Sequence, residues 1–153
     1  MHEVIVVCVD GSKGGYAAVA EAAELATRFS TQLIALSVEA ALPRYAAAMG
    51  EVHALEWEED GYYDQVGHEA ARIAGQHGAK LQHEIRLGHA AETIIHFVEE
   101  VGADLVVLGF KGRSRIARFM IGNTAQKVNA YAKASVLIVK PYGSAGGTRR
   151  PAH

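Results

Sequence analysis

Three short runs of the sequence are almost continuously apolar and rich in β-branched residues. They are VIVVCV (residues 4–9), DLVVLG (residues 104–109) and SVLIVK (residues 135–140). Such runs are typical of parallel strands that helices cover on both faces. Two less uniform runs, residues 32–38 and 79–87, fit strands that lie nearer an edge of the sheet or are partly exposed.

Helical patterns separate these runs. Residues 16–29 are alanine-rich with apolar residues at helical spacing, residues 62–77 fit a second helix, and residues 90–101 carry one broad apolar face. The alternation of strands and helices, with short connections and right-handed crossovers, predicts an α/β fold. We expect a single-domain, open, doubly wound parallel sheet of five strands, with helices on both faces.

The length of the chain, 153 residues of which 50% are hydrophobic, fits one domain with a single sizeable core. We expect this domain to cover residues 1–141. Residues 142–153 form a Gly/Ser/Pro-containing tail that is expected to be flexible. Residues 39–60, with an acidic cluster, are expected to be a long surface connection, either a lid or a partly ordered loop.

The overall charge argues against a general attraction to polyanions. A formal net charge of -2 favours neither nucleic acid nor an anionic membrane surface as a partner, so any anion site must be local. The N-terminus shows no targeting signal, no apolar run is long enough to span a bilayer, and the single cysteine, Cys8, fits a core position. We therefore expect a cytoplasmic protein.

A Gly-rich and cationic stretch, GFKGRSRIARFMIGNT, connects the fourth predicted strand to a helix. Gly109 and Gly112 allow backbone N–H groups to approach a ligand closely, while Gly122, Asn123 and Thr124 open a helix whose first turn can bind phosphate. Asn and Thr are also good N-cap residues. A flexible surface loop or a simple turn would explain the same glycines, and the cations would also fit a solvated face.

The stretch resembles the nucleotide-binding motif of the universal stress protein family, G-x-x-G, nine residues, then Gly followed by Ser or Thr. Gly109, Gly112 and Gly122 match this spacing, whereas Asn123 stands at the hydroxyl position and Thr124 follows one place later. The resemblance extends over residues 2–141. It implies the five-stranded fold of the adenine nucleotide alpha hydrolase-like proteins and, for the ATP-binding branch, an adenine nucleotide as ligand.

The resemblance also implies a role for each matching position. Asp10 resembles the carboxylate near the ribose and phosphates, and Val38 the residue whose backbone recognises adenine. Phosphates would repel an anionic Asp10 unless Mg²⁺ or a ribose hydroxyl lies between them, which makes Asp10 a candidate Mg²⁺ ligand. Asp10 and Ser12 could instead only cap the first helix. The other implied contacts are with the base (Val9), with the ribose (Leu108 and Gly109) and with the phosphates (Gly112, Gly122, Asn123 and Thr124). Apart from the resemblance, Arg113 of the cationic stretch is a candidate phosphate contact, with a solvated face as the alternative.

Three functions are compatible with these observations. The first is a stress-response protein that binds ATP with Mg²⁺ and hydrolyses it slowly at most, since no P-loop and no positioned general base are recognisable. The second is a homodimeric interaction module that does not bind ATP. Under either hypothesis, the strand from Ser135 to Lys140 would pair two copies through a sheet edge. The third is an ATP pyrophosphatase, but its S-G-G-x-D-S signature is missing.

Overall fold

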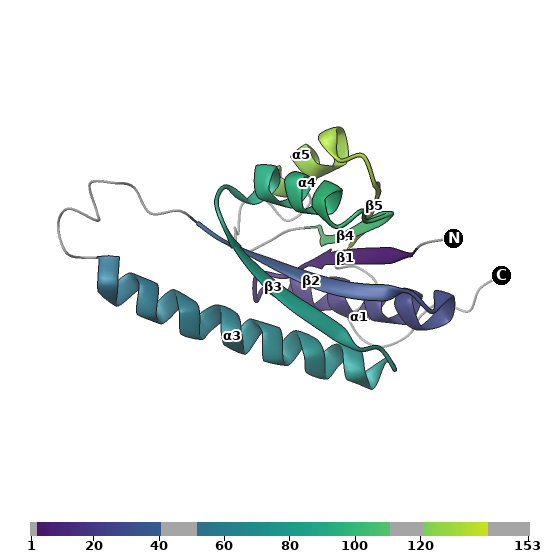
Figure 1. Ribbon diagram of the computed structural model, residues 1–153, viewed down its shortest axis with the longest axis horizontal. Coiled ribbons are helices and arrows are strands. Elements are labelled where there is room, and N and C mark those ends of the chain that lie inside the picture. Colours follow the sequence, from purple (N-terminus) through teal and green to yellow (C-terminus); the bar gives the residue numbers. More distant parts are fainter. Residues whose placement is uncertain (1–2, 41–51, 111–120, 141–153) are drawn as a thin grey trace.

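Five strands form one parallel sheet in the order β3-β2-β1-β4-β5 (Figure 1). The structure is a computed structural model that describes residues 3–40, 52–110 and 121–140. The strands are β1 (Val4–Cys8), β2 (Gln32–Glu39), β3 (Leu81–Leu87), β4 (Leu105–Gly109) and β5 (Ser135–Val139). All five predicted strands are confirmed.

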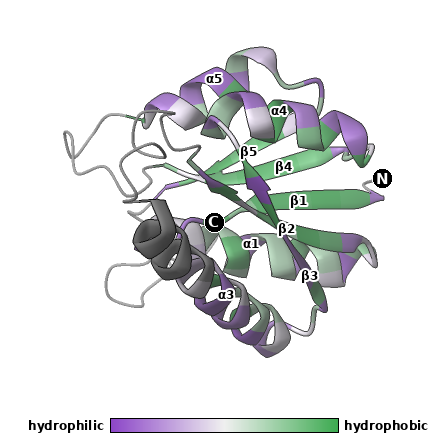
Figure 2. Ribbon diagram, turned by 60° about the vertical axis from the view of Figure 1, so that its left-hand side comes forward, coloured by the Kyte–Doolittle hydropathy of each residue, from purple (hydrophilic) through white to green (hydrophobic). Residues whose placement is uncertain are grey.

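Helices cover both faces of this sheet, as Figure 2 shows. They are α1 (Lys13–Phe29), α3 (Val52–Gln76), α4 (Ala90–Glu100) and α5 (Asn123–Tyr131). Helices α1 and α3 pack on one face, and α4 and α5 on the other. The predicted α/β fold with a doubly wound parallel sheet is confirmed.

Side chains of the central strand β1 pack in both halves of the core. Ile5 and Val7 pack toward α1 and α3, whereas Val6 packs toward α4, and each of these three side chains is 0% exposed. This alternation follows from the period of two along a strand. Burying one such aliphatic side chain contributes about 1.5–3 kcal/mol, so β1 is the apolar centre of the molecule.

Two predictions about strand exposure have different outcomes. The expectation that residues 32–38 and 79–87 are nearer an edge or partly exposed holds for β3, which is an edge strand; β2 lies next to it, but β2 pairs with both β1 and β3 and is mostly buried, so partial exposure is wrong for β2. The prediction that the last strand lies at an edge is confirmed, since β5 pairs only with β4 among the described strands. Polar Gln32 and Ser37 make β2 less uniform in sequence without making it an edge strand.

The predicted surface connection over residues 39–60 is wrong in its second half. Helix α3 begins at Val52, and the sequence from there is rich in Ala, Leu and Glu, which have high helix propensity. Residues 41–51 and the predicted tail, residues 142–153, lie outside the described residues. None of the described helices has both the length and the apolar character that crossing a membrane requires.

The strand order places a topological switch point between β1 and β4. The chain moves from β1 to β2 and β3 with helices on one face, then crosses to β4 and β5 with helices on the other. Right-handed crossovers require the helices to change face when the direction reverses. Ligands of open α/β sheets bind at the carboxyl ends of strands beside such a point.

Candidate functional site

The segment after β1 forms a tight turn that leads into α1. One carboxylate oxygen of Asp10 accepts a hydrogen bond from the Ser12 N–H at 3.0 Å, and the Ser12 hydroxyl accepts one from the Gly15 N–H at 3.0 Å. Ser12 is thus the N-cap of α1. The capping hypothesis is correct for Ser12, while Asp10 shapes the turn before the cap.

The end of β4 lies directly against the first turn of α1. A Cβ atom on Gly109 would come within 2.7 Å of the Gly14 carbonyl carbon, which leaves no room for a side chain. Leu108 is 4% exposed and packs in the core cluster on the α4 side. The absence of a side chain at position 109 therefore allows the first turn of α1 to lie against the end of β4.

Helix α5 begins beside the end of β4. Its N-cap is Gly122, whose N–H donates to the Phe110 carbonyl at 2.8 Å, and the Phe110 N–H donates to the Val139 carbonyl at 3.0 Å. The expectation that Asn123 or Thr124 caps this helix is wrong, because both lie inside its first turn.

The two helix N-termini at this edge differ. The Ser12 side chain caps α1, but no side chain of the described residues caps α5. The first-turn N–H groups of α5 therefore supply the stronger set of donors for an anion, with the positive end of the helix dipole behind them.

The end of β2 is tied to β1, β3 and α3 by polar contacts that the sequence analysis missed. Ser37 is 0% exposed, and its hydroxyl donates to the Val9 carbonyl at 2.7 Å and lies 2.9 Å from His83 Nε2. The Val38 carbonyl accepts a hydrogen bond from the Tyr63 hydroxyl at 3.2 Å. The sequence signal that could have indicated these contacts is Ser37 itself, a single serine within the apolar run of residues 32–38.

The predicted residues that the structure describes lie at the carboxyl edge of the sheet and at the start of α5. Val9 is 2% exposed, Val38 is half-buried, and Asn123 is exposed. Gly112 and Arg113 lie outside the described residues, as does the rest of the cationic stretch from 111 to 120. The described members of the predicted set are Val9, Asp10, Val38, Leu108, Gly109, Gly122, Asn123 and Thr124.

Few side chains that could bind a metal ion lie at this edge among the described residues. No group of three His, Cys, Asp or Glu residues that could hold a metal ion occurs in the described parts of the chain. Cys8 is a packing residue: burial raises the pKa of its thiol to about 12, and the charge of Asp10 acts in the same direction. Its thiol therefore stays protonated at neutral pH.

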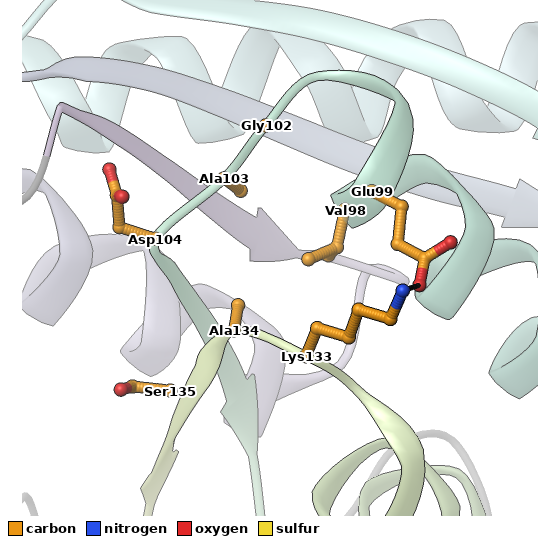
Figure 3. Close-up of a pocket in the computed structure, with 8 residues that line it drawn as sticks. All are labelled: Val98, Glu99, Gly102, Ala103, Asp104, Lys133, Ala134 and Ser135. Atoms are coloured by element: carbon orange, nitrogen blue, oxygen red, sulfur yellow. Dashed lines mark ion pairs between the residues drawn. The ribbon is translucent and has the colours of Figure 1, made fainter.

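A separate hollow of about 640 Å³ lies at the opposite, amino edge of the sheet (Figure 3). Lys133 and Glu99 form an ion pair across its rim at 3.3 Å. Asp104 closes one end of it and accepts hydrogen bonds from the Glu3 and Val4 N–H groups at 2.6 and 3.1 Å. None of the predicted site residues lines this hollow.

Comparison with protein families identifies the family to which the chain belongs. The model described as the universal stress protein family matches residues 1–140. The chain belongs to the universal stress protein family. A universal stress protein of Mycobacterium tuberculosis is 31% identical over 147 residues, covering 90% of this chain and 96% of that protein. The resemblance inferred from the glycine motif is therefore confirmed at the level of the family.

Solved structures agree with this assignment. Universal stress protein UspA from Lactobacillus plantarum is 26% identical with a TM-score of 0.76, covering 90% of this chain and 97% of that one. A universal stress protein in complex with cAMP is 27% identical with a TM-score of 0.67, covering 90% and 96%.

More distant structures share the fold alone. One from Archaeoglobus fulgidus, in complex with dAMP, is 22% identical with a TM-score of 0.65, covering 92% of this chain and 98% of that one. One from Arabidopsis thaliana, with AMP bound, is 14% identical with a TM-score of 0.63, covering 90% and 91%.

Proposed function

We propose that this chain is an adenine nucleotide-binding protein of the stress response that takes ATP with Mg²⁺ at the carboxyl edge of its sheet. The observation that carries the proposal is the start of α5, which lacks a side-chain cap among the described residues and is tethered to the end of β4 by the Gly122 N–H. Such a turn binds phosphate through its N–H groups and the helix dipole. Structures of related proteins in complex with cAMP, dAMP and AMP support the same ligand class.

The proposed roles divide the edge into a nucleoside side and a phosphate side. The base would lie beside Val9, with the Val38 backbone recognising adenine, and the ribose beside Leu108 and Gly109. Asp10 would lie between ribose and phosphates. The phosphates would contact Gly112 and Arg113 together with the first turn of α5, namely Gly122, Asn123 and Thr124.

Mg²⁺ fits this arrangement on chemical grounds. Mg²⁺ is usually held by one or two carboxylates together with substrate phosphates and water, rather than by an all-protein cage. Asp10 would supply the carboxylate, and the ion would remove the repulsion between that carboxylate and the phosphates. We further propose that hydrolysis is slow at most, and that the protein acts in the cytoplasm through its nucleotide-bound state.

Calorimetry with ligand-stripped protein tests the proposal. ATP with Mg²⁺ should bind, and Gly122→Val should weaken ATP binding by tenfold or more, a loss of about 1.4 kcal/mol or greater. The backbone of Gly122, with φ of -64° and ψ of 153°, suits valine, so the fold should persist.

Gly75→Val is the matched control for this experiment, because nothing lies within 4 Å of the Cβ position at Gly75 in α3. Absence of ATP binding by the parent protein would refute the proposed function. Equal ATP affinity of Gly122→Val and the parent would refute the role of α5 in phosphate binding.

The edge strand β5 favours a second proposal, pairing of two copies through Ser135 to Lys140. Four of its five residues are apolar and only half-buried, and β4 is its sole partner among the described strands. Unpaired backbone groups on such a strand favour pairing with another chain. A homodimeric interaction module that does not bind ATP would use this same surface.

A further inference from the structure

Helix α3 places a tyrosine hydroxyl on the turn after β1. The Tyr62 hydroxyl donates a hydrogen bond to the Asp10 carbonyl at 2.5 Å. Gly11, the next residue, has a φ of +88°, and a Cβ atom there would lie 2.0 Å from the Tyr62 hydroxyl oxygen. The lack of a side chain at Gly11 thus leaves the space that the tyrosine fills, and glycine also permits the left-handed backbone there.

The next residue of α3 reaches the end of β2. Tyr63 is 5% exposed, and its hydroxyl donates to the Val38 carbonyl at 3.2 Å. The two tyrosine rings pack edge to face, with centroids 5.0 Å apart and an interplanar angle of 77°. Neighbouring residues of one helix are therefore bonded to the main chain of two different strand ends.

These two carbonyls belong to peptide units at the nucleoside side of the proposed site. Because a peptide unit is planar, fixing the Asp10 carbonyl also fixes the direction of the Gly11 N–H. The Val38 carbonyl lies on the side of β2 that faces β1, so the Tyr63 hydrogen bond holds the end of β2 on that side. Backbone groups that are held in place before a ligand arrives bind it without an ordering cost at that moment. The two tyrosines thus hold main-chain groups at the ends of β1 and β2.

We propose that Tyr62 and Tyr63 are positioning residues of the nucleotide site, which rests on the function proposed above. Tyr62 holds the turn beside the ribose and phosphates, and so sets the affinity for nucleotides of any base. Tyr63 holds the backbone of Val38, and so sets the preference for adenine over guanine. Through this pair, α3 influences nucleotide binding without a contact between its side chains and the nucleotide.

Tyrosine-to-phenylalanine variants test the proposal because they keep the ring packing and remove only the hydroxyl. Loss of the hydrogen bond lets the turn move in the free protein, so Tyr62→Phe should weaken ATP and GTP alike, by at most about fivefold, which corresponds to a hydrogen bond worth about 1 kcal/mol. Tyr63→Phe should reduce the ratio of ATP to GTP affinity by about the same factor. Calorimetry gives the affinities, and urea denaturation gives the free energy of unfolding of each variant.

Tyr131→Phe is the control, since this tyrosine of α5 is 73% exposed, and it should change neither quantity. A second measurement uses the unmodified protein: ATP should slow amide hydrogen exchange in the part of α3 that contains Tyr62 and Tyr63. Unchanged exchange there would overturn the proposal.

The outcomes separate this inference from the proposed function. A parent protein that binds no nucleotide would overturn both. A parent that binds ATP, with variants that lose stability but keep its affinity and its ATP-to-GTP ratio, would overturn only the positioning roles. An effect of one tyrosine alone would overturn the role assigned to the other.

Discussion

Ser37 and His83 form a partly buried polar contact near the site. The Ser37 hydroxyl hydrogen is directed to the Val9 carbonyl, so His83 Nε2 donates to the Ser37 oxygen, which assigns its hydrogen to Nε2. The ring lies against α3 at Gly67, where a Cβ atom would come 2.3 Å from His83 Nδ1. Gly67 therefore makes room for the imidazole.

The environment of His83 predicts a pH dependence of stability. Burial lowers the pKa of His83 below its ordinary value of 6.5, and His68 acts in the same direction, while Asp64 and Glu84 partly oppose this. The unfolded chain thus binds a proton more readily than the folded one. The stability that neutral His83 contributes is fully present above the pKa of this histidine in the unfolded chain. It is lost as the pH falls through the pKa of His83 in the folded protein.

We expect the free energy of unfolding to decrease from pH 7.5 to pH 5. Its slope against pH should be on the order of the slope for uptake of one proton on unfolding. Urea denaturation across this range should show a shallower decrease for His83→Gln than for the parent. His77→Gln, at an exposed position, is the control and should follow the parent. Parallel curves for His83→Gln and the parent would contradict the assignment to His83.

Predictability at the residue scale depended on sequence distance. The Ser12 cap could be predicted because cap and capped N–H are three residues apart. The Ser37 contacts join residues 28 and 46 positions apart, and the Tyr62 contact spans 52. No local pattern encodes such partners, because they depend on how the strands are ordered in the sheet.

At the scale of elements, α1 and α5 have N-termini of different chemistry. Ser12 satisfies an N–H group of α1, so Ser12→Ala should lower the free energy of unfolding by about 1 kcal/mol, and Ser12→Gly by only a few tenths. Chemical denaturation of the three proteins measures both values. Alanine and glycine variants of equal stability would contradict a capping role for Ser12.

Continuous apolar runs predicted β1, β4 and β5 correctly. Burial on both faces explains the composition of β1 and β4, whereas β5 is apolar but only half-buried. The start of α3 was missed because the acidic cluster and the mixed composition of residues 52–60 suggested a connection. The burial of β2 was missed for another reason: its polar Ser37 is hydrogen-bonded inside the molecule, so polarity there did not indicate exposure.

At the scale of the whole molecule, β5 predicts the oligomeric state. The Ser135 N–H donates to the Asp104 carbonyl and the Phe110 N–H donates to the Val139 carbonyl, so Ser135 and Val139 face β4. Since these directions alternate along a strand, the Ile138 amide points to the open edge.

Ile138→Pro would remove that amide without breaking the pairing with β4, and edge strands tolerate proline. We expect the parent to be a dimer and the variant a monomer by light scattering at micromolar concentration. Ile138→Val, which keeps the amide, should remain a dimer. A monomeric parent would contradict pairing through β5.

The strand order could not be derived from hydrophobic periodicity, because periodicity does not indicate which strands are neighbours in the sheet. It came from the family resemblance, and the structure confirms the fold that the resemblance implied. The nucleotide contacts of Gly112 and Arg113 stay predictions, because both residues lie outside the described parts of the chain.

The placement of β1 between β2 and β4 also shapes how the chain is made. On the ribosome, β1 can pair with β2 once Glu39 has emerged, but β4 follows only at residues 105–109. During that interval one apolar edge of the nascent β1 has no neighbour, and such edges recruit other chains. Translation that stalls before Gly109 thus leaves a fragment prone to aggregation, whereas a stall after it releases a chain whose central strand is already enclosed.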